Sequence, residues 1–321
     1  MKRLILFAVL ALSLLTVSAY GRNPKYANRA EMIAAQIHDP QSKYVVVVCH
    51  RGDWRSYPEN SVEAIASVAT IGGDMAEIDL KMTKDSVLVL SHDATLDRCT
   101  TGSGKISDYT YEELLQFDRK DHKGNVVKGM HIATLREGLE AAKDKICVNV
   151  DQGYEFYEQV LAIAEELGVT DQILIKGSRP IDVVAAHESA HRHNTMYMPV
   201  VTLSVQSGRE LFKSYIDRGV TPLAYELCWK AGQDDLFLDA VAKIKAQNSK
   251  VWVNTLWGSI CGGDDRADAA AFKTGDLDYV YGRLLDNGVS MIQTDRPALL
   301  IKYLQEKGRH PEFRKGRIRF K

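Results

Sequence analysis

The sequence lacks the features by which several classes of protein are recognised. None of its five cysteines lies in a Cys-x-x-Cys pair, so the spacing typical of a zinc site is absent. No stretch rich in proline, glycine or serine divides the 321 residues, and no internal repeat is visible, so nothing marks a boundary between domains. Basic charge is not in excess either, because 41 lysines and arginines face 42 acidic residues. This balance does not favour a nucleic-acid partner.

The N-terminus departs from this ordinary composition. Lys2 and Arg3 precede an uncharged run over residues 4–17, and small residues follow it. This pattern predicts a secretory signal peptide over residues 1–19, with cleavage after Gly21 as the alternative. An uncleaved anchor is the competing interpretation, but the run is shorter than the roughly 20 residues of a spanning helix. We therefore expect a secreted or periplasmic protein without stable membrane insertion, whose 39 remaining basic and 42 acidic residues give a net charge of −3.

The cysteines are odd in number, which leaves at least one free thiol in an exported protein. Cys49 and Cys147 lie inside apolar runs, where a reduced thiol behaves as a small hydrophobic side chain. A disulfide between Cys99 and Cys261 stays open as an alternative to five free thiols.

Apolar runs typical of buried strands recur eight times along the chain. They cover residues 44–49, 75–80, 146–151, 172–176, 196–202, 222–227, 250–255 and 289–293. Helical patterns occupy most of the gaps, at residues 154–167, 180–191, 207–218, 234–247 and 295–306. Eight strands alternating with helices predict an α/β fold, the (β/α)8 TIM barrel.

We expect one barrel domain over residues 44–307, followed by a basic tail over residues 308–321. The stretch 81–133 is too long for one loop and is interpreted as an insertion after the second barrel strand. A doubly wound open sheet is the competing fold. It lacks support, because the Gly-Ser-Gly at 102–104 does not follow a long buried strand.

Side chains that can act as acids, bases or metal ligands lie at or near the ends of the first strand-like runs. His50 follows the first run, and His92 follows a short run at 87–90. Glu77 and Asp79 are two residues apart on one strand and therefore share a face. A pair of carboxylates on one face suits a hard cation, and two histidines can serve as general base and general acid. The ends of barrel strands are also where barrel enzymes place their chemistry.

These residues belong to a series of short motifs. The series is His50-Arg51-Gly52, Pro58-Glu59-Asn60-Ser61, Glu77-x-Asp79 and His92-Asp93, followed by Leu96, Arg98, Thr100 and Gly102-Ser103-Gly104. In combination these motifs resemble the glycerophosphodiester phosphodiesterase family. The resemblance is strongest over residues 44–117 and continues more weakly to the Thr-Asp-Arg-Pro at 294–297. The resemblance implies a TIM barrel with the same insertion, a His50/His92 acid–base pair and a divalent cation. Calcium and magnesium both suit an all-oxygen site.

The third metal ligand departs from the family pattern. The family supplies a glutamate from the next barrel strand, with a lysine two residues later. Here that strand offers only Asp151, and the lysine position falls on Gly153. Lys176, at the end of the following strand, is the candidate to supply the missing cation to the phosphate. The resemblance therefore implies a divergent branch with Glu77, Asp79 and Asp151 as metal ligands.

Three further residues are candidates for binding the phosphate or the substrate. A guanidinium suits phosphate oxygens, so Arg51 is one of them, although an ion pair with Glu59 or Glu77 is the alternative. Asn254 stands where the family has a Trp-Thr pair, and Glu226 ends the strand before it. Pairing with Lys230, or an exposed loop, is the alternative for Glu226.

The predicted function is metal-dependent hydrolysis of small glycerophosphodiesters to an alcohol and glycerol phosphate, through a cyclic phosphate. His50 is assigned as base and His92 as acid. A phospholipase-D-like activity on intact lipids is one alternative, against which the polar loop at 259–267 counts. A barrel that binds phosphodiesters without turnover is another. The sequence does not indicate an oligomeric state.

Overall fold

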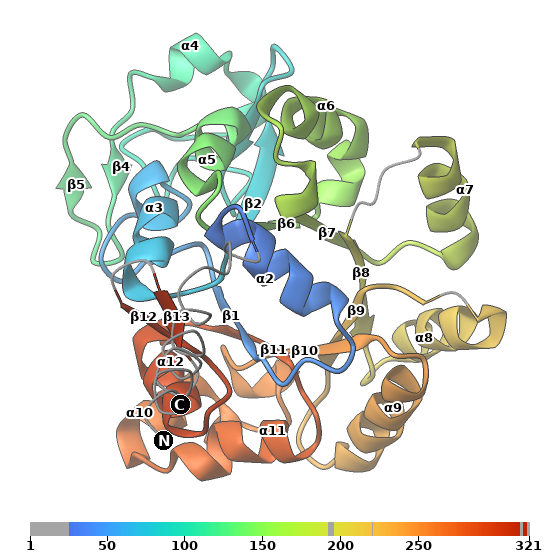
Figure 1. The fold of residues 1–321 in the computed structure, drawn as a ribbon. Coiled ribbons are helices and arrows are strands. Elements are labelled where there is room, and N and C mark those ends of the chain that lie inside the picture. Colours follow the sequence, from blue (N-terminus) through green and yellow to red (C-terminus); the bar gives the residue numbers. More distant parts are fainter. Residues whose placement is uncertain (1–25, 192–195, 220, 315–316, 320–321) are drawn as a thin grey trace, which may run out of the picture.

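Eight parallel strands form a closed barrel in the computed structural model, which describes residues 26–191, 196–219, 221–314 and 317–319 (Figure 1). Because β1 pairs with both β2 and β11, the sheet closes on itself, which confirms the predicted TIM barrel and excludes the open sheet. The barrel strands are β1 (Val46–Cys49), β2 (Met75–Met82), β6 (Cys147–Asp151), β7 (Ile173–Gly177), β8 (Met196–Thr202), β9 (Ala224–Cys228), β10 (Lys250–Asn254) and β11 (Met291–Thr294).

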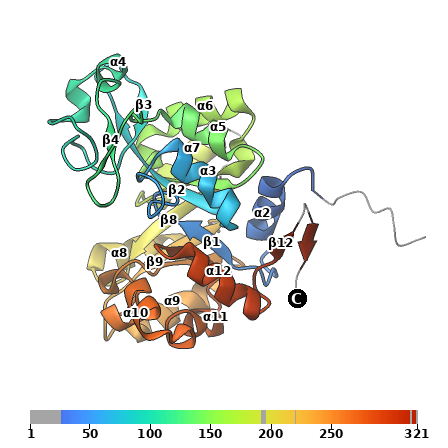
Figure 2. The ribbon, with the colours of Figure 1, turned by 90° about the vertical axis from the view of Figure 1, so that its left-hand side faces the viewer.

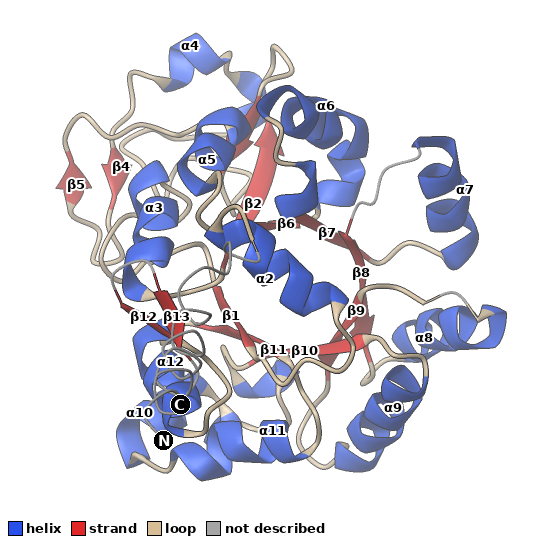
Figure 3. Ribbon diagram, in the orientation of Figure 1, coloured by secondary structure: helices blue, strands red, loops and turns tan. Residues whose placement is uncertain are grey.

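Helices surround the barrel, and Figure 3 shows them outside the ring of strands. They are α3 (Val62–Ile71), α5 (Leu135–Ala142), α6 (Tyr157–Leu167), α7 (Ile181–His191), α8 (Gln206–Arg218), α9 (Asp234–Ala246), α10 (Asp268–Thr274), α11 (Arg283–Asp286) and α12 (Pro297–Glu306). In β1, Val46 and Val48 belong to the core inside the barrel, whereas Val47 and Cys49 belong to the core between strands and helices. Burial on both faces explains why this strand is uniformly apolar.

A helix closes the end of the barrel at which the strands begin. This helix, α2 (Arg29–His38), adds Met32, Ile33 and Ile37 to the core inside the barrel. It lies at the opposite end from the insertion (Figure 2). The predicted signal peptide over residues 1–19 falls outside the described residues. Within the predicted basic tail, β12 (Glu312–Arg314) and β13 (Arg317–Arg319) pair as an antiparallel hairpin.

The insertion after β2 is attached to the barrel mouth. Its first strand, β3 (Leu88–Leu90), pairs antiparallel with the end of β2, and α4 (Tyr111–Leu114), β4 (Arg119–Lys120) and β5 (Val126–Val127) follow. Arg119 is buried and donates to the backbone carbonyls of Glu59 at 2.7 Å and Asn60 at 3.1 Å. The insertion is therefore held against the loop that follows β1.

Boundaries and thiols differ in detail from the sequence-based expectation. Tyr157 begins α6, because a 3-10 turn over Gly153–Phe156 occupies the start of the predicted helix. All five cysteines are buried and free, so the alternative of a Cys99–Cys261 disulfide is not realised. Among the described residues, no helix combines the length and the apolar character needed to span a membrane.

Candidate active site at the barrel mouth

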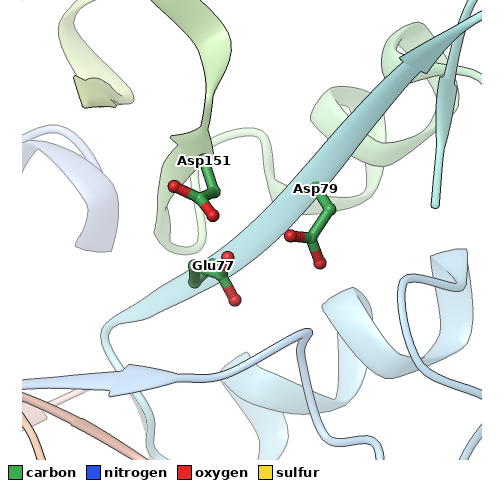
Figure 4. Close-up of side chains that lie close together, drawn as sticks. All are labelled: Glu77, Asp79 and Asp151. Carbon is green, nitrogen blue, oxygen red and sulfur yellow. The ribbon is translucent and has the colours of Figure 1, made fainter. Parts of the chain in front are cut away.

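Three carboxylates converge at the carboxyl end of adjacent strands β2 and β6. The register of the sheet places Asp79 opposite Asp151, with Glu77 one pleat earlier on the same face as Asp79. One oxygen of each carboxylate lies within 4.8 Å of the others, and Figure 4 shows the three side chains facing one another. Glu77 and Asp79 are only 2% and 4% exposed. The three acids named from the sequence thus form one cluster.

This cluster has the properties of a hard-cation site. Burial raises the pKa of Glu77 well above its ordinary value, and the charge of Asp79 raises it further, while Lys176 opposes the change. Buried carboxylates so close to one another are costly unless a cation offsets their charge. Because every potential ligand atom is a carboxylate oxygen, the residues fit a divalent ion such as calcium or magnesium.

The His-Arg-Gly motif positions one of these acids. The backbone N–H of Arg51 donates to Glu77 Oε2 at 2.9 Å. The chain then turns sharply at Gly52, whose φ is +74°. A Cβ at Gly52 would lie 2.8 Å from the backbone of Ala64, so no other residue fits this turn. The glycine therefore brings the first strand end against the second.

The Pro-Glu-Asn-Ser motif positions another of them. Asn60 Nδ2 donates to Asp79 Oδ2 at 2.9 Å, and Asn60 Oδ1 accepts from the Asp79 backbone N–H at 3.0 Å. Asn60 has a φ of +57°, a left-handed conformation that asparagine tolerates better than most residues. The next residue, Ser61, is the N-cap of α3 and accepts from the Ala64 N–H. Asn60 thus holds Asp79 by two hydrogen bonds, and Ser61 caps the helix that follows.

His50 is held by an acid from the far end of the chain. Its Nδ1 lies 2.8 Å from Asp295 Oδ1, and Trp54 Nε1 donates to the same oxygen at 2.7 Å. Burial opposes the charge of Asp295, but the His50 hydrogen bond and charge and the Trp54 hydrogen bond lower its pKa overall. Nδ1 is thereby fixed as the nitrogen facing Asp295, which leaves Nε2 for substrate.

His92 is held in the same way, but by residues of its own loop. Its Nδ1 lies 2.7 Å from Asp93 Oδ1, while Arg98 Nε donates to Asp93 Oδ2 at 2.7 Å. The Arg98 hydrogen bond is the main cause that holds the pKa of Asp93 far below its usual range. Ser91 N–H donates to the backbone carbonyl of Asp79 at 3.0 Å, which places this loop beside the carboxylate cluster.

A shared acid links the two histidine loops. Glu59 accepts from Arg51 Nη1 at 3.0 Å and from Arg98 Nη2 at 2.7 Å. Burial would raise the pKa of Glu59, but the two arginines lower it to about 2. Arg51 Nε is also 3.7 Å from Asp79 Oδ2. Arg51 therefore has the ion pair with Glu59 that the sequence left open as the alternative to phosphate binding.

Lys176, Glu226 and Asn254 form a buried network on β7, β9 and β10. Lys176 Nζ lies 3.1 Å from Glu226 Oε2 and 3.5 Å from Asp151 Oδ1. Asn254 Nδ2 donates to Glu226 Oε1 at 2.8 Å. Burial works against the charge of Lys176, but Glu226, Asp151 and Glu77 raise its pKa overall. Glu226 thus pairs with Lys176 instead of Lys230. The positive charge of Lys176 lies beside the carboxylate cluster.

Sequence reasoning did not identify Asp295 and Asn60 as functional positions. Both lie inside motifs that had been recognised, the Thr-Asp-Arg-Pro and Pro-Glu-Asn-Ser segments, but nothing local showed what their side chains contact. The structure brings together at one barrel mouth the two histidines, the three acids, Arg51 and Lys176. The structure is thus a TIM barrel whose mouth carries two histidine–aspartate pairs, which are candidate acid–base groups, beside a cluster of three carboxylates that could hold a cation.

Comparison with known proteins finds relatives over part of the chain. Residues 50–208 match the model of the glycerophosphoryl diester phosphodiesterase family, and residues 197–304 match a model described as a domain of unknown function. A glycerophosphodiester phosphodiesterase of Caldanaerobacter subterraneus is 33% identical over 137 residues, which are 40% of this chain and 56% of the relative. Glycerophosphodiester phosphodiesterase 1 of Rattus norvegicus is 36% identical over 119 residues, 36% of this chain and 35% of the relative. The match thus spans only about half of the first relative and a third of the second.

Solved structures share the fold. A glycerophosphoryl diester phosphodiesterase of Parabacteroides distasonis superposes with a TM-score of 0.70 at 23% identity, covering 90% of this chain and 95% of that one. A phosphodiesterase of Oleispira antarctica, determined with the product sn-glycerol-3-phosphate, gives a TM-score of 0.58 at 22% identity, covering 80% and 97%. Residues 50–208 of this chain therefore match the glycerophosphoryl diester phosphodiesterase family, which confirms the resemblance found in its motifs.

Proposed function

We propose that the protein is a metal-dependent hydrolase of small glycerophosphodiesters, releasing an alcohol and glycerol phosphate. The proposal rests on one observation: two histidines, each held at Nδ1 by an aspartate, lie beside a cluster of three carboxylates, two of them buried. A site that only binds phosphodiesters has no use for two oriented acid–base groups. The family match and the activity named for the relatives support the same reaction.

The carboxylate cluster would hold the cation. Glu77, Asp79 and Asp151 are the ligands, and a bound divalent ion would supply positive charge to offset the charge that a phosphodiester gains in the transition state. Calcium and magnesium both fit these oxygens. Arg51 and Lys176 add positive charge from the chain itself, at 3.7 Å from Asp79 and 3.5 Å from Asp151. We assign both to electrostatic support of the phosphate.

The histidines divide the proton transfers. In the first step His50 Nε2 takes the proton of the glycerol hydroxyl next to the ester, whose oxygen bonds to phosphorus. The ester bond to the headgroup breaks, and His92 Nε2 gives its proton to the departing alkoxide. In the second step His92 takes a proton from water as the water oxygen attacks the cyclic phosphate. His50 then returns its proton to the released glycerol oxygen.

Asp151 and Lys176 explain how the departure from the family pattern is accommodated. An aspartate is shorter than the glutamate it replaces, yet Asp151 reaches the cluster because its strand position is directly opposite Asp79. Lys176 reaches Asp151 from the neighbouring strand, so a positively charged side chain is present although Gly153 has none. We propose that Glu226 and Asn254 fix this lysine and thereby shape the substrate pocket.

The signal-peptide pattern at residues 1–19 supports a place of action outside the cytoplasm. Deacylated phospholipid headgroups such as glycerophosphocholine are the substrates we propose. The product found with the Oleispira antarctica phosphodiesterase, sn-glycerol-3-phosphate, is the glycerol phosphate expected here.

Hydrolysis by the purified protein tests the proposal. Glycerophosphocholine, glycerophosphoethanolamine and glycerophosphoinositol are each incubated with enzyme, first with EDTA and then with calcium or magnesium restored. We expect release of glycerol phosphate that EDTA stops and one of the two cations restores. Turnover that continues after removal of all divalent ions would contradict the metal assignment. Cation binding without turnover of any diester would favour the binding protein, and cleavage of intact lipid alone would favour the phospholipase-D-like alternative.

A further inference from the structure

Another buried acid lies behind the active site and takes no part in the proposed reaction. Asp268, the first residue of α10, is 2% exposed. Its Oδ1 accepts from Thr255 Oγ1 and from Tyr281 OH, each at 2.8 Å. Its Oδ2 accepts from Thr294 Oγ1 at 2.8 Å and from the Asp295 backbone N–H at 2.7 Å. All four hydrogen-bond donors are neutral, and they come from the ends of β10 and β11 and from the segment over Asp278–Gly282.

These contacts connect Asp268 to His50 through a single residue. The backbone N–H of Asp295 is held by Asp268, and the side chain of Asp295 holds His50 Nδ1 at 2.8 Å. The segment that carries Asp295 follows β11 directly and begins α12 two residues later. Without the Asp268 contact, β11 would still form, but the turn after it would lose the hydrogen bond that fixes the backbone position of Asp295.

Only an ionised carboxylate satisfies this arrangement. Four donors need four acceptor sites, which the two oxygens of a carboxylate provide. An amide at the same position has one oxygen, and its NH2 group would face two donors. Burial raises the pKa of Asp268 to about 6, although its four hydrogen bonds oppose the rise. The chain therefore maintains a buried acid whose desolvation is costly, and the four hydrogen bonds offset that cost.

We propose that Asp268 is a positioning residue for the His50–Asp295 pair: its Oδ2 fixes the backbone of Asp295, and the orientation of the His50 imidazole depends on that contact. The inference rests on the proposed function for its kinetic consequence but not for its structural one. It assigns a catalytic support role to a position outside the matched family region, within residues 197–304.

A double-mutant cycle gives the kinetic test. Asp268→Asn is expected to lower kcat by about 10-fold to 100-fold with KM changed less than about twofold, because a misplaced catalytic group costs rate more than binding. In an Asp295→Asn background the same substitution should have almost no further effect on kcat, because Asp268 acts through Asp295. Losses that multiply in the double variant would overturn the proposal.

A pair of milder variants keeps the test valid if Asp268→Asn does not fold. Thr294→Val removes a hydroxyl from the oxygen that also holds Asp295, together with the acceptor of the Arg296 backbone N–H. Tyr281→Phe removes a hydroxyl from the other oxygen. Both should lower Tm by similar amounts, but only Thr294→Val should reduce kcat, by several-fold. Equal effects of the two variants on kcat would show that Asp268 has a structural role only.

A measurement without substrate separates this inference from the proposed function. In the wild type, ¹⁵N NMR of the histidine rings should show His50 with one fixed tautomer, protonated at Nδ1 toward Asp295. Thr294→Val and Asp268→Asn should give a mixture of tautomers, whereas Tyr281→Phe should not. If the protein shows this pattern but hydrolyses no phosphodiester, the result would support the inference and contradict the proposed function. An unchanged His50 signal in both variants would overturn the inference.

Discussion

The two histidine loops make the same hydrogen bond by different means. His50 is paired with an acid 245 residues away and its side chain is 11% exposed, whereas His92 is paired with the next residue and is 45% exposed. Trp54 braces the first pair from a partly buried position, and the largely exposed Arg98 braces the second. The His50 pair is therefore a product of barrel closure, while the His92 pair belongs to one short loop.

This difference suits the two roles that we propose. A base that activates a hydroxyl bound at a fixed place gains from a rigid, enclosed ring. An acid that protonates leaving alcohols of different shapes gains from a position open to solvent, where the product can depart. The same contrast predicts that loss of the acid that orients His50 costs more rate than loss of the acid that orients His92.

Removal of either imidazole should have the largest effect. His50→Ala and His92→Ala should each lower kcat for glycerophosphocholine by about 10²-fold to 10⁴-fold, because each removes one general acid–base group. Neither histidine belongs to the carboxylate cluster, so binding of Mn²⁺, measured by electron paramagnetic resonance, should stay within a few-fold of wild type. Near-normal turnover by either variant would show that the assignment of that histidine is wrong.

The choice of leaving group distinguishes the base from the acid. A glycerophosphodiester of p-nitrophenol needs no proton on its leaving oxygen, so His92→Ala should recover about 10²-fold relative to its rate with glycerophosphocholine. His50→Ala should recover almost nothing, because its hydroxyl still requires a base. The release of p-nitrophenolate at 405 nm measures both. Recovery by the His50 variant instead would reverse the two roles.

Loss of the orienting carboxylates should be unequal. Asp295→Asn should reduce kcat by about 10²-fold, since an amide favours the wrong tautomer of an enclosed ring. Asp93→Asn should cost no more than about 10-fold, because His92 is exposed and can find water instead. Asp97→Asn serves as the control, since the Asp97 carboxylate accepts from the Gly104 backbone N–H in the same insertion and contacts neither histidine in the described structure. A larger loss in the Asp93 variant would contradict the contrast between the two loops.

Glu59, which links the loops through two arginines, should affect stability more than rate. Its pKa falls from the ordinary 4.5 to about 2, despite burial, through the arginine contacts. A lowered carboxylate pKa stabilises the fold above the ordinary value, and this contribution is lost as pH falls from 4.5 toward 2. At neutral pH Glu59→Gln should therefore lower the free energy of unfolding by at most about 3 kcal/mol.

The pH dependence of that difference is the sharper test. Urea unfolding of wild type and Glu59→Gln should give curves that converge as pH falls from about 4.5 to 2.5. At pH 7 turnover should fall less than in any histidine variant, because Glu59 touches neither ring. Stability curves that stay parallel across this range would show that the ion pairs of Glu59 contribute little.

Local patterns revealed the part of the site that consecutive residues build. Alternation along one strand was enough to place Glu77 and Asp79 on one face, and apolar runs that end in His50 and His92 were enough to place them at strand ends. The barrel itself followed from eight strand-like runs separated by helical patterns. Errors of two or three residues at element boundaries came from turns such as Gly153–Phe156.

What the sequence could not show depends on which strands become neighbours across the barrel. The pairing of His50 with Asp295 requires β11 to lie beside β1, a relation that no local pattern encodes. Lys176 could be proposed as a cation near Asp151, but its pairing with Glu226 depends on how strands β7 to β9 lie around the barrel. Asp268 was missed because a lone acid at a helix start is ordinary at the surface, and only the structure shows that it is buried.

The distance along the chain between His50 and Asp295 bears on synthesis. A polypeptide made only as far as residue 290 already contains both histidines and all three cluster acids, yet it lacks the carboxylate that orients His50. A prematurely terminated product, or a chain still emerging from the ribosome, would therefore hold a misaligned base. Under the proposed function, alignment of the His50 base therefore requires the last barrel strand and the residue that follows it, and hence a nearly full-length chain.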